Sequence, residues 1–239
     1  MLLSLKRCGH NTVNDKTSEH IILSDTNVAY VLSFFLEKKI IPERNIFLGE
    51  EKAKVEFHPI VKEEIEAHFT AWLTCRELNI STKNACPSFF DSIGKSAIEK
   101  ILKFVSGNLA PSLTVNITSN EFFNRKKVYE AVRKKIQTDW ALEGVKGKKI
   151  SSKPSDQDYS ILFSVEKNLL KLATNDEILL AIARELLVEG STYKTEDLIN
   201  LVYLADSSVE EKIKEVCATL SALDQTFSLA RALRPKVLR

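Results

Sequence analysis

Glycine and proline are scarce in this sequence. Its 239 residues include only seven glycines and six prolines, whereas average proteins contain about 7% glycine and about 5% proline. Few residues are therefore suited to tight turns, and the abundant Leu, Ile, Lys and Glu favour long helices. The scattered glycines form no GxGxxG fingerprint, no GxxxxGK[ST] loop and no GxSxG elbow. These absences argue against the common nucleotide-binding loops and against an α/β-hydrolase nucleophile.

Cysteine is also scarce, and its spacing does not suit a disulfide framework. The four cysteines stand at positions 8, 75, 86 and 217, without a CxxC pair. This scatter is typical of a chain in a reducing compartment. Cys8 and His10 are the only Cys/His pair at ligand spacing, and a zinc site needs at least three protein ligands. We therefore expect no bound metal and no cofactor.

Long apolar runs are missing as well. No window provides the roughly 20 apolar residues that a membrane-spanning helix needs. The first ten residues, MLLSLKRCGH, become polar too early for the apolar region of a signal peptide. The sequence therefore predicts an intracellular protein, cytoplasmic or nuclear, that does not enter a membrane.

A recognisable catalytic motif is absent. The one grouping that could act as acid and base is Glu63, Glu64 and Glu66 beside His68. On an exposed helix face such glutamates are usually solvated charges. His68 adjoins the apolar stripe of the same helix, where we expect it to pack. The sequence therefore predicts no enzyme and no catalytic residues, and only a site assembled from distant residues would escape this reasoning.

Apolar periodicity predicts a mainly α-helical fold. Capping patterns, prolines and glycines set the ends of the expected helices. These helices cover residues 26–39, 59–78, 88–105 with a kink near Gly94, 118–143, 155–172, 175–189, 196–205 and 207–234. Residues 43–57 are ambiguous between a strand and a helical turn, and residues 113–117 have β-character without an obvious partner.

Two irregular regions indicate how the chain is divided. Within residues 1–25, Leu2–Leu5 and Ile21–Leu23 could form a small hairpin, or the whole segment could be an arm that docks on another subunit. Residues 109–117 form the expected boundary between two lobes. The predicted fold is a helical bundle in two lobes with a small irregular or β N-terminal segment. Its parts are residues 1–25, 26–108, 118–234 and a basic tail at 235–239.

The stretch from Thr118 to Lys153 carries the strongest chemical signal. From Arg125 onward it holds ten Lys or Arg against three acids, in a chain whose net charge is only +2. A capping-box pattern opens it at Thr118, and Gly144 ends the expected helix. One helical stripe, the expected buried face, contains Phe122, Tyr129, Val132, Ile136 and Trp140. The sequence thus predicts a basic amphipathic helix followed by a basic loop.

A basic surface of this kind suggests an anionic partner. The helix and the loop supply the expected phosphate contacts, and an aromatic ring within the basic face is a candidate for base stacking. The candidate nucleic-acid-binding residues are Phe123, Arg125, Lys126, Lys127, Arg133, Lys134, Lys146, Lys148 and Lys149. The alternative interpretation is a solvated helix face followed by a mobile connector.

The C-terminal part suggests association with other chains. Apolar residues recur at alternating spacings of four and three across residues 209–230, as in a coiled-coil seam. This seam fits either packing within the bundle or a subunit contact. Residues 154–230 carry fourteen acids and six bases, so that they could pair with either of the two basic segments that flank them.

Together these features predict a sequence-independent nucleic-acid-binding protein. We expect RNA as the partner, and homo-oligomers formed through the N-terminal arm and the C-terminal helix. The layout is comparable with that of a small helical nucleocapsid protein, without a shared motif. The alternative is a helical scaffold or adaptor subunit whose basic patch meets an acidic protein surface.

Overall fold

The structure of the protein is a computed structural model. It describes residues 21–37, 46–48, 53–82, 85–87, 90–110, 113, 115–144, 153–195 and 197–198. Several predicted features lie outside these ranges. They are the N-terminal segment up to residue 20, the loop lysines Lys146, Lys148 and Lys149, the apolar seam at 209–230 and the basic tail at 235–239.

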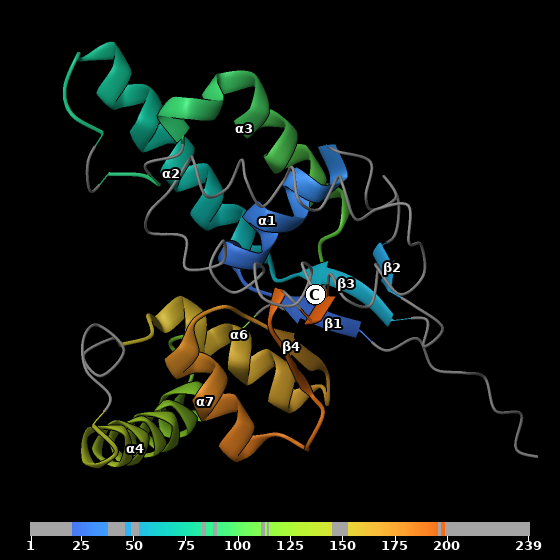
Figure 1. The fold of residues 1–239 in the computed structure, drawn as a ribbon, viewed down its shortest axis with the longest axis vertical. Coiled ribbons are helices and arrows are strands. Elements are labelled where there is room, and N and C mark those ends of the chain that lie inside the picture. Colours follow the sequence, from blue (N-terminus) through green and yellow to red (C-terminus); the bar gives the residue numbers. More distant parts are fainter. Residues whose placement is uncertain are drawn as a thin grey trace, which may run out of the picture.

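A small, mainly parallel sheet lies at the centre of the fold (Figure 1). In spatial order its strands are β2 (Ile46–Leu48), β3 (Ala53–Phe57), β1 (Ile21–Ser24), β4 (Lys171–Ala173) and β5 (Thr192–Tyr193). β1 pairs in parallel with β3 and with β4, and β4 pairs in parallel with β5. β2 is antiparallel to β3. The chain therefore passes from one side of β1 to the other between β3 and β4.

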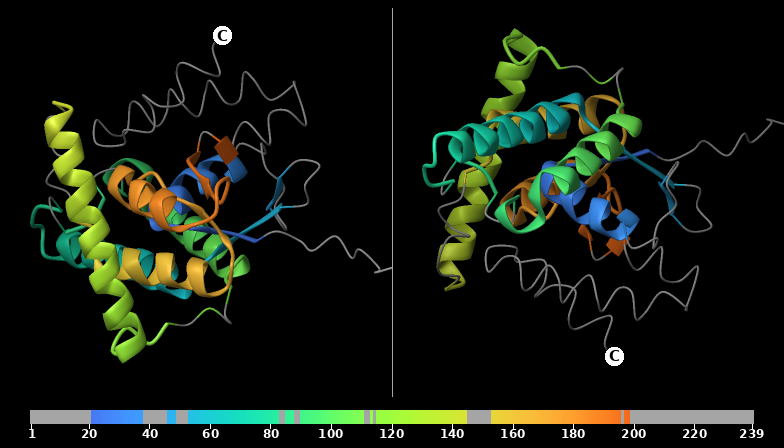
Figure 2. Two further views of the ribbon diagram at one scale, coloured as in Figure 1. Left: turned by 90° about the horizontal axis from the view of Figure 1, so that it is seen from below. Right: turned by 90° about the horizontal axis from the view of Figure 1, so that it is seen from above.

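Six helices among the described residues cover the sheet. On one face lie α1 (Thr26–Glu37), α2 (Pro59–Glu77) and α3 (Phe90–Gly107), and on the other face lie α6 (Asp156–Lys167) and α7 (Glu177–Leu186), crossed by α4 (Asn120–Leu142). The opposite views in Figure 2 show the two helical layers in turn. Helices within each layer contact one another, and α6 also contacts β4. None of the helices in the described ranges is long and apolar enough to cross a membrane.

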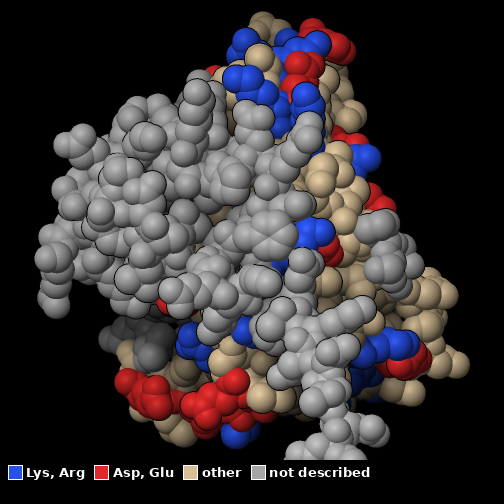
Figure 3. Space-filling model, turned by 90° about the vertical axis from the view of Figure 1, so that its right-hand side faces the viewer, with Lys and Arg blue, Asp and Glu red and all other residues tan. Residues whose placement is uncertain are grey.

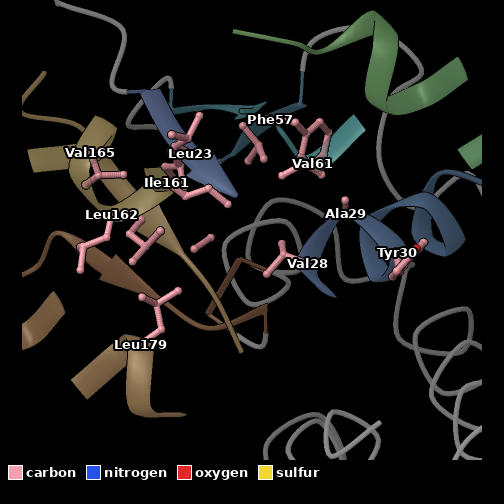
Figure 4. Packing of buried hydrophobic residues seen from close by; sticks show 14 of the residues in the cluster. Leu23, Val28, Ala29, Tyr30, Phe57, Val61, Ile161, Leu162, Val165 and Leu179 are labelled. Atoms are coloured by element: carbon pink, nitrogen blue, oxygen red, sulfur yellow. The ribbon is translucent and has the colours of Figure 1, made fainter. Parts of the chain in front are cut away.

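The core is continuous through the sheet. Figure 4 shows Leu23 of β1 beside Ile161 of α6, with Phe57 on the neighbouring strand β3. All three side chains are almost fully buried. Because β1 has helices on both faces, its residues read as a short apolar run, without the alternation of a half-exposed strand.

The prediction of a mostly helical protein is confirmed, and a small parallel sheet accompanies the helices. β1 and β3 come from the region before residue 108, and β4 and β5 follow the basic helix. The sheet thus takes strands from both sides of the expected lobe boundary. The division into two lobes stays a prediction.

The ambiguous residues 43–57 contribute the antiparallel pair β2 and β3. Among the described residues of 113–117, no strand forms. Instead Leu109 makes an isolated bridge with Phe57, where Phe57 N–H donates to the Asn108 carbonyl and Ala110 N–H donates to the Phe57 carbonyl. The β-character was therefore placed a few residues too late in the chain.

Most of the expected helix ends agree with the structure for the expected reasons. Pro59 occupies the first turn of α2, where its missing N–H is not needed. α3 is kinked at Gly94, whose φ of 75° suits glycine. Ser155 and Asp158 form a reciprocal capping box at the start of α6.

One predicted helix was too long. We expected apolar residues up to Leu172 to continue the helix that begins after Ser155, but α6 ends at Lys167. Leu169 adopts a positive φ of 53°, and Leu170 N–H donates back to the Val165 carbonyl, which closes the helix. The chain then enters β4, so one apolar run contains both a helix and a buried strand.

Two expected caps were also misplaced. Ser119, not Thr118, caps α4, and its hydroxyl accepts from Phe122 N–H. Asp176, not Thr174, caps α7, and its carboxylate accepts from the N–H groups of Ile178 and Leu179. Thr174 is therefore free to interact elsewhere.

The buried imidazole of His58 predicts a pH-dependent stability. Its Nδ1 caps α2 by accepting from Ile60 N–H at 3.2 Å. Burial lowers the pKa of His58 to about 4, and the Leu113 carbonyl offsets part of this effect. An unfolded histidine has a pKa of about 6.5, so the unfolded chain binds more protons between these values. The contribution of His58 to the free energy of unfolding therefore rises with pH across roughly pH 4 to 6.5 and is lost as the pH falls.

His58→Asn retains a capping side chain and should flatten this rise. Urea unfolding at about pH 4.5, 5.5 and 7 measures the change in slope. An unchanged slope would assign the proton uptake to other groups.

Candidate functional site

The predicted basic helix exists and packs by its predicted face. α4 begins at Asn120 and ends at Leu142, followed by Gly144 with a φ of 77°. Phe122, Tyr129 and Ile136 are buried, and Val132 and Trp140 are partly buried. Phe122 meets Phe163 of α6 edge to face at 5.8 Å, and Tyr129 stacks on Tyr159 at 5.6 Å. These contacts seat α4 across α6.

Arg125 lies inside this packing contact and does not face an open surface. Its guanidinium forms two hydrogen bonds with the Glu166 carboxylate of α6, one of them from Nε to Oε2 at 2.7 Å. The Tyr129 hydroxyl donates to the same Oε2 at 2.7 Å. The three side chains form a bidentate, charge-assisted network, so that the main role of Arg125 in this arrangement is to hold α4 on α6.

Two further predicted cations are paired within the protein. Lys126 Nζ lies 2.5 Å from Asp156 Oδ1 in the first turn of α6. Arg133 donates twice to Glu130 Oε2, at 3.0 and 2.7 Å, and once to Gln137 at 2.7 Å. Its side chain is only 14% exposed. The basic stretch therefore presents less free positive charge than its composition suggests.

The outer ridge of α4, formed by Phe123, Lys127 and Lys134, is open to solvent. Phe123 is 54% exposed, and Lys127 Nζ lies 4.4 Å from the centre of its ring. Within the described ranges, Lys134 has no ion-pair partner. A cation over an aromatic face is attracted by the ring, so the pair is a compact basic and aromatic surface. Helical spacing places this ridge next to the flank that carries Lys126 and Arg133.

Charge is mixed on one face of the molecule. On the face shown in Figure 3, Lys and Arg lie next to Asp and Glu at both ends of the molecule. The described part of this face therefore does not form one continuous basic surface.

A second group of polar residues lies where the parallel strands end. Asp25 directly follows β1 and Thr174 directly follows β4, and these two strands are neighbours. β1 is also the strand at which the chain changes sides. In open parallel sheets, ligands bind beyond the carboxyl ends of the strands at such a switch point.

Asp25 is held firmly in this position. Its side chain is 3% exposed. Oδ1 accepts from Val28 N–H at 2.8 Å, which caps α1, and Oδ2 accepts from the Thr174 hydroxyl at 2.5 Å. Burial raises the pKa of Asp25 to about 7, with smaller contributions from Asp158 and Asp176, and the hydrogen bonds from Thr174 and Val28 act the other way.

Three other acids surround the same place. Asp176 follows β4 and caps α7, Asp158 lies in the first turn of α6, and Glu64 lies in α2. Burial raises the pKa of Asp158 as well, with contributions from Asp176 and Glu64. Asp25 and Asp158 each respond to other acids of this set, and the Thr26 hydroxyl, next to Asp25 in the chain, donates to Glu64. We call Asp25, Glu64, Asp158 and Asp176 the carboxylate cluster.

In three members of the carboxylate cluster, protein donors hold one oxygen and leave the other open. Asp158 Oδ2 accepts from Ser155, Asp176 Oδ1 accepts from two α7 amides, and Glu64 Oε2 accepts from the Thr26 hydroxyl. The structure records no partner for the second oxygen of any of these three within the described ranges. Hydrogen bonds of this kind orient a ligating carboxylate and leave an acceptor for a ligand.

Helix capping explains part of this arrangement. Asp25 and Asp176 are N-caps, and Asp158 belongs to a capping box. Carboxylates are common at these positions in any helical protein. Capping does not account for Glu64, nor for the convergence of four acids from four helices on one place. A buried carboxyl group with a raised pKa, such as that of Asp25, is common at functional sites.

The carboxylate cluster and the basic helix meet at the start of α6. Asp156, the partner of Lys126, precedes Asp158 by two residues in the same turn. Lys153 Nζ, just before α6, lies 3.7 Å from Glu130 of α4. A flank of α4 that carries positive charge therefore borders the helix that supplies one of the clustered acids.

The sequence alone did not identify the carboxylate cluster. Glu64 was expected to be a solvated charge, but it is half-buried and accepts from Thr26. The useful signal would have been an acid within three residues of the end of each apolar strand, in Ile21–Asp25 and Lys171–Asp176. The second strand was hidden in a predicted helix. The expectation that the protein is not an enzyme stays a prediction, and the carboxylate cluster argues against it.

Direct coordination of a metal is not preformed. In the described ranges, no three His, Cys, Asp or Glu side chains are close enough to hold a metal ion together. The Cys8 and His10 pair considered above lies outside those ranges. A divalent cation at the carboxylate cluster would therefore need water or a substrate oxygen among its ligands.

Comparison with protein-family models, curated proteins and solved structures finds no match for this chain. The function is therefore inferred from the geometry of the site itself.

The network around Glu166 predicts a structural role for Arg125. Arg125→Gln should lower the free energy of unfolding by about 1–3 kcal/mol, because the half-buried Glu166 loses its charged partner. Lys127→Gln, two residues further along α4 on the open ridge, should change it by less than about 0.5 kcal/mol. Urea unfolding of both variants measures the difference. Equal, small effects would show that Arg125 does not anchor α4.

Proposed function

We propose that this protein binds RNA along α4 and hydrolyses its phosphodiester backbone at the carboxylate cluster with the help of a divalent cation. The observation that carries the proposal is the convergence of Asp25, Glu64, Asp158 and Asp176 beyond the carboxyl ends of β1 and β4. The basic ridge on the adjoining helix supports nucleic acid as the substrate.

Grouped carboxylates favour a hard divalent cation. Burial is the main cause of the raised pKa values of Asp25 and Asp158, and neighbouring carboxylates add a smaller repulsion. A cation of opposite charge favours the ionised carboxylates. Mg²⁺ usually keeps several waters and is held by one or two carboxylates together with substrate phosphates. The open oxygens of Asp158, Asp176 and Glu64 suit this mode, which does not require three direct protein ligands.

The residues of the carboxylate cluster divide the work of hydrolysis. Asp158 and Asp176 would hold the cation, and Glu64 would accept a hydrogen bond from a water at the site. Asp25 and Thr174 keep Asp176 and the strand ends in place. The cation would polarise a water and neutralise charge on the phosphate. Water attacks phosphorus while the bond from phosphorus to the leaving sugar oxygen breaks, and the proton that the attacking water loses passes through solvent to that leaving oxygen.

The ridge of α4 holds the nucleic acid. Lys127 and Lys134 contact phosphates, and Phe123 stacks on a base. Lys126 and Arg133 add positive potential from within their ion pairs, and Arg125 contributes mainly by holding the helix. The loop lysines Lys146, Lys148 and Lys149 extend the surface in this proposal. Binding of this kind is largely independent of sequence.

The remaining expectations complete the proposal. The protein acts inside the cell, and it associates through the N-terminal arm and the C-terminal helix. The two lobes expected from sequence would then correspond to the helical layers on either side of the sheet.

Cleavage depends on the carboxylate cluster. Asp176→Asn and Asp158→Asn should each lower the rate of Mg²⁺-dependent cleavage of a labelled RNA by about 100-fold or more, because an amide cannot replace an anionic ligand. Asp156→Asn, an acid in the same turn of α6 but outside the carboxylate cluster, is the matched control and should retain cleavage. EDTA should abolish the activity of the unsubstituted protein. Cleavage that survives in both cluster variants, or no cleavage with Mg²⁺ or Mn²⁺, overturns the hydrolytic part of the proposal.

Binding depends on the ridge of α4. Lys127→Glu with Lys134→Glu should weaken the binding of labelled RNA, and should reduce the slope of log K against log salt by about 2. Lys95→Glu with Lys103→Glu makes the same charge change on α3 and is the control. Asp176→Asn serves as the background, in EDTA, so that cleavage does not interfere. A DNA oligonucleotide of the same sequence tests the choice of RNA.

The cleavage and binding experiments test the two parts of the proposal separately. Binding without cleavage would keep the nucleic-acid proposal and remove the catalytic one. If neither RNA nor DNA binds at low salt, the helical scaffold or adaptor subunit becomes the better interpretation, because the ion pairs of Lys126 and Arg133 already show part of the basic helix contacting acidic protein groups.

A further inference from the structure

A groove lies along the surface between the last turns of α4 and helix α7. Its volume is about 430 Å³. Ile136 and Leu180 are buried, and Trp140 is partly buried, so the groove has apolar side chains at its base. The charged residues that also line it are Asp139, Glu143, Glu177, Arg184, Glu185 and Lys194. An apolar base with charged edges suits a peptide that carries both apolar and charged side chains.

The α4 side of the groove carries two negative charges at the C-terminal end of the helix, where negative charge is unfavourable. Asp139 and Glu143 are exposed and stand four residues apart at the end of α4. Like charges at this spacing repel, and both lie at the negative end of the helix dipole. α4 has no basic residue in its last turn. Within the described ranges, neither carboxylate has an ion-pair partner.

The other charges in the groove leave this negative excess in place. Glu185 pairs with Lys135 at 3.5 Å. Arg184 and Lys194 stand on the α7 side together with Glu177. With the paired Glu185 left out, three acids and two bases line the groove, and the two acids without an ion-pair partner in the described ranges, Asp139 and Glu143, lie on α4. A basic ligand would meet Asp139 and Glu143 first.

We propose that the chain's own basic C-terminal segment, residues 231–239, docks in this groove. The segment RALRPKVLR has four cations and no acid, with apolar residues between them. It therefore matches both the negative edge and the apolar base. The 32 residues between Leu198 and Arg231 could extend to roughly 100 Å, which is enough to reach the groove within one chain. This docking is independent of the catalytic proposal.

A labelled peptide tests the groove directly. The probe is RALRPKVLR, and the protein is the full chain in which Arg231, Arg234, Lys236 and Arg239 are each replaced by Gln. The peptide should bind, and the affinity should fall as salt rises. Asp139→Lys with Glu143→Lys in this background should weaken binding at least about tenfold. Glu77→Lys with Glu99→Lys makes the same charge change on α2 and α3 and should have little effect.

Competition tests whether the chain's own segment is the occupant. In the unsubstituted protein the tethered segment has an effective concentration in the millimolar range, so the added peptide should bind at least about tenfold more weakly than to the neutralised variant. Equal affinity in the two proteins, or no binding to either, overturns the proposal. Concentration-dependent self-association that disappears with Asp139→Lys would assign the groove to the tail of a second copy, and would also overturn docking within one chain.

Discussion

The hydrogen bond from the Thr174 hydroxyl to Asp25 joins two strand ends that are 149 residues apart in the chain. The same hydroxyl accepts from Asp176 N–H at 3.1 Å, and Asp25 N–H donates to the Ala173 carbonyl at 3.1 Å. Because β1 is the middle strand, this junction sets where α1 and α7 begin. The buried carboxylate of Asp25 requires these hydrogen bonds, because a buried carboxylate without donors is costly in free energy. The helices that carry Glu64 and Asp158 then pack around a fixed point.

Local patterns predicted the helices, because the periods and end signals of a helix are contained within it. The basic helix, the capping box at Ser155 and the kink at Gly94 all follow from neighbouring residues. The parallel strands β4 and β5 have three and two residues, and their partners are distant in sequence. Leu172 therefore looked like a continuation of α6. With β4 unrecognised, nothing in the sequence placed Asp176 beside Asp25, and the carboxylate cluster was not predictable.

The uneven charge of the chain has a partial explanation in the contact between α4 and α6. Arg125 and Lys126 of α4 pair with Glu166 and Asp156 at the two ends of α6. Composition alone cannot separate such internal pairs from cations offered to a partner, because both appear as the same excess of lysine and arginine. The structure separates them by contact and exposure. Among the described residues of α4, the ridge of Phe123, Lys127 and Lys134 remains exposed for a partner.

The carboxylate cluster can persist without a cation because most of its charges lie at helix N-termini. Asp25, Asp158 and Asp176 receive backbone N–H groups from α1 and α7 or from the turn before α6. These donors and the helix dipoles stabilise the ionised form, and they act against burial, which is the main cause of the raised pKa values of Asp25 and Asp158. The hydrogen bonds that cap these helices thus also fix one carboxylate oxygen of Asp158 and one of Asp176 in place. A ligand for the second oxygen would therefore meet groups that are already ordered, and would not have to order them on binding.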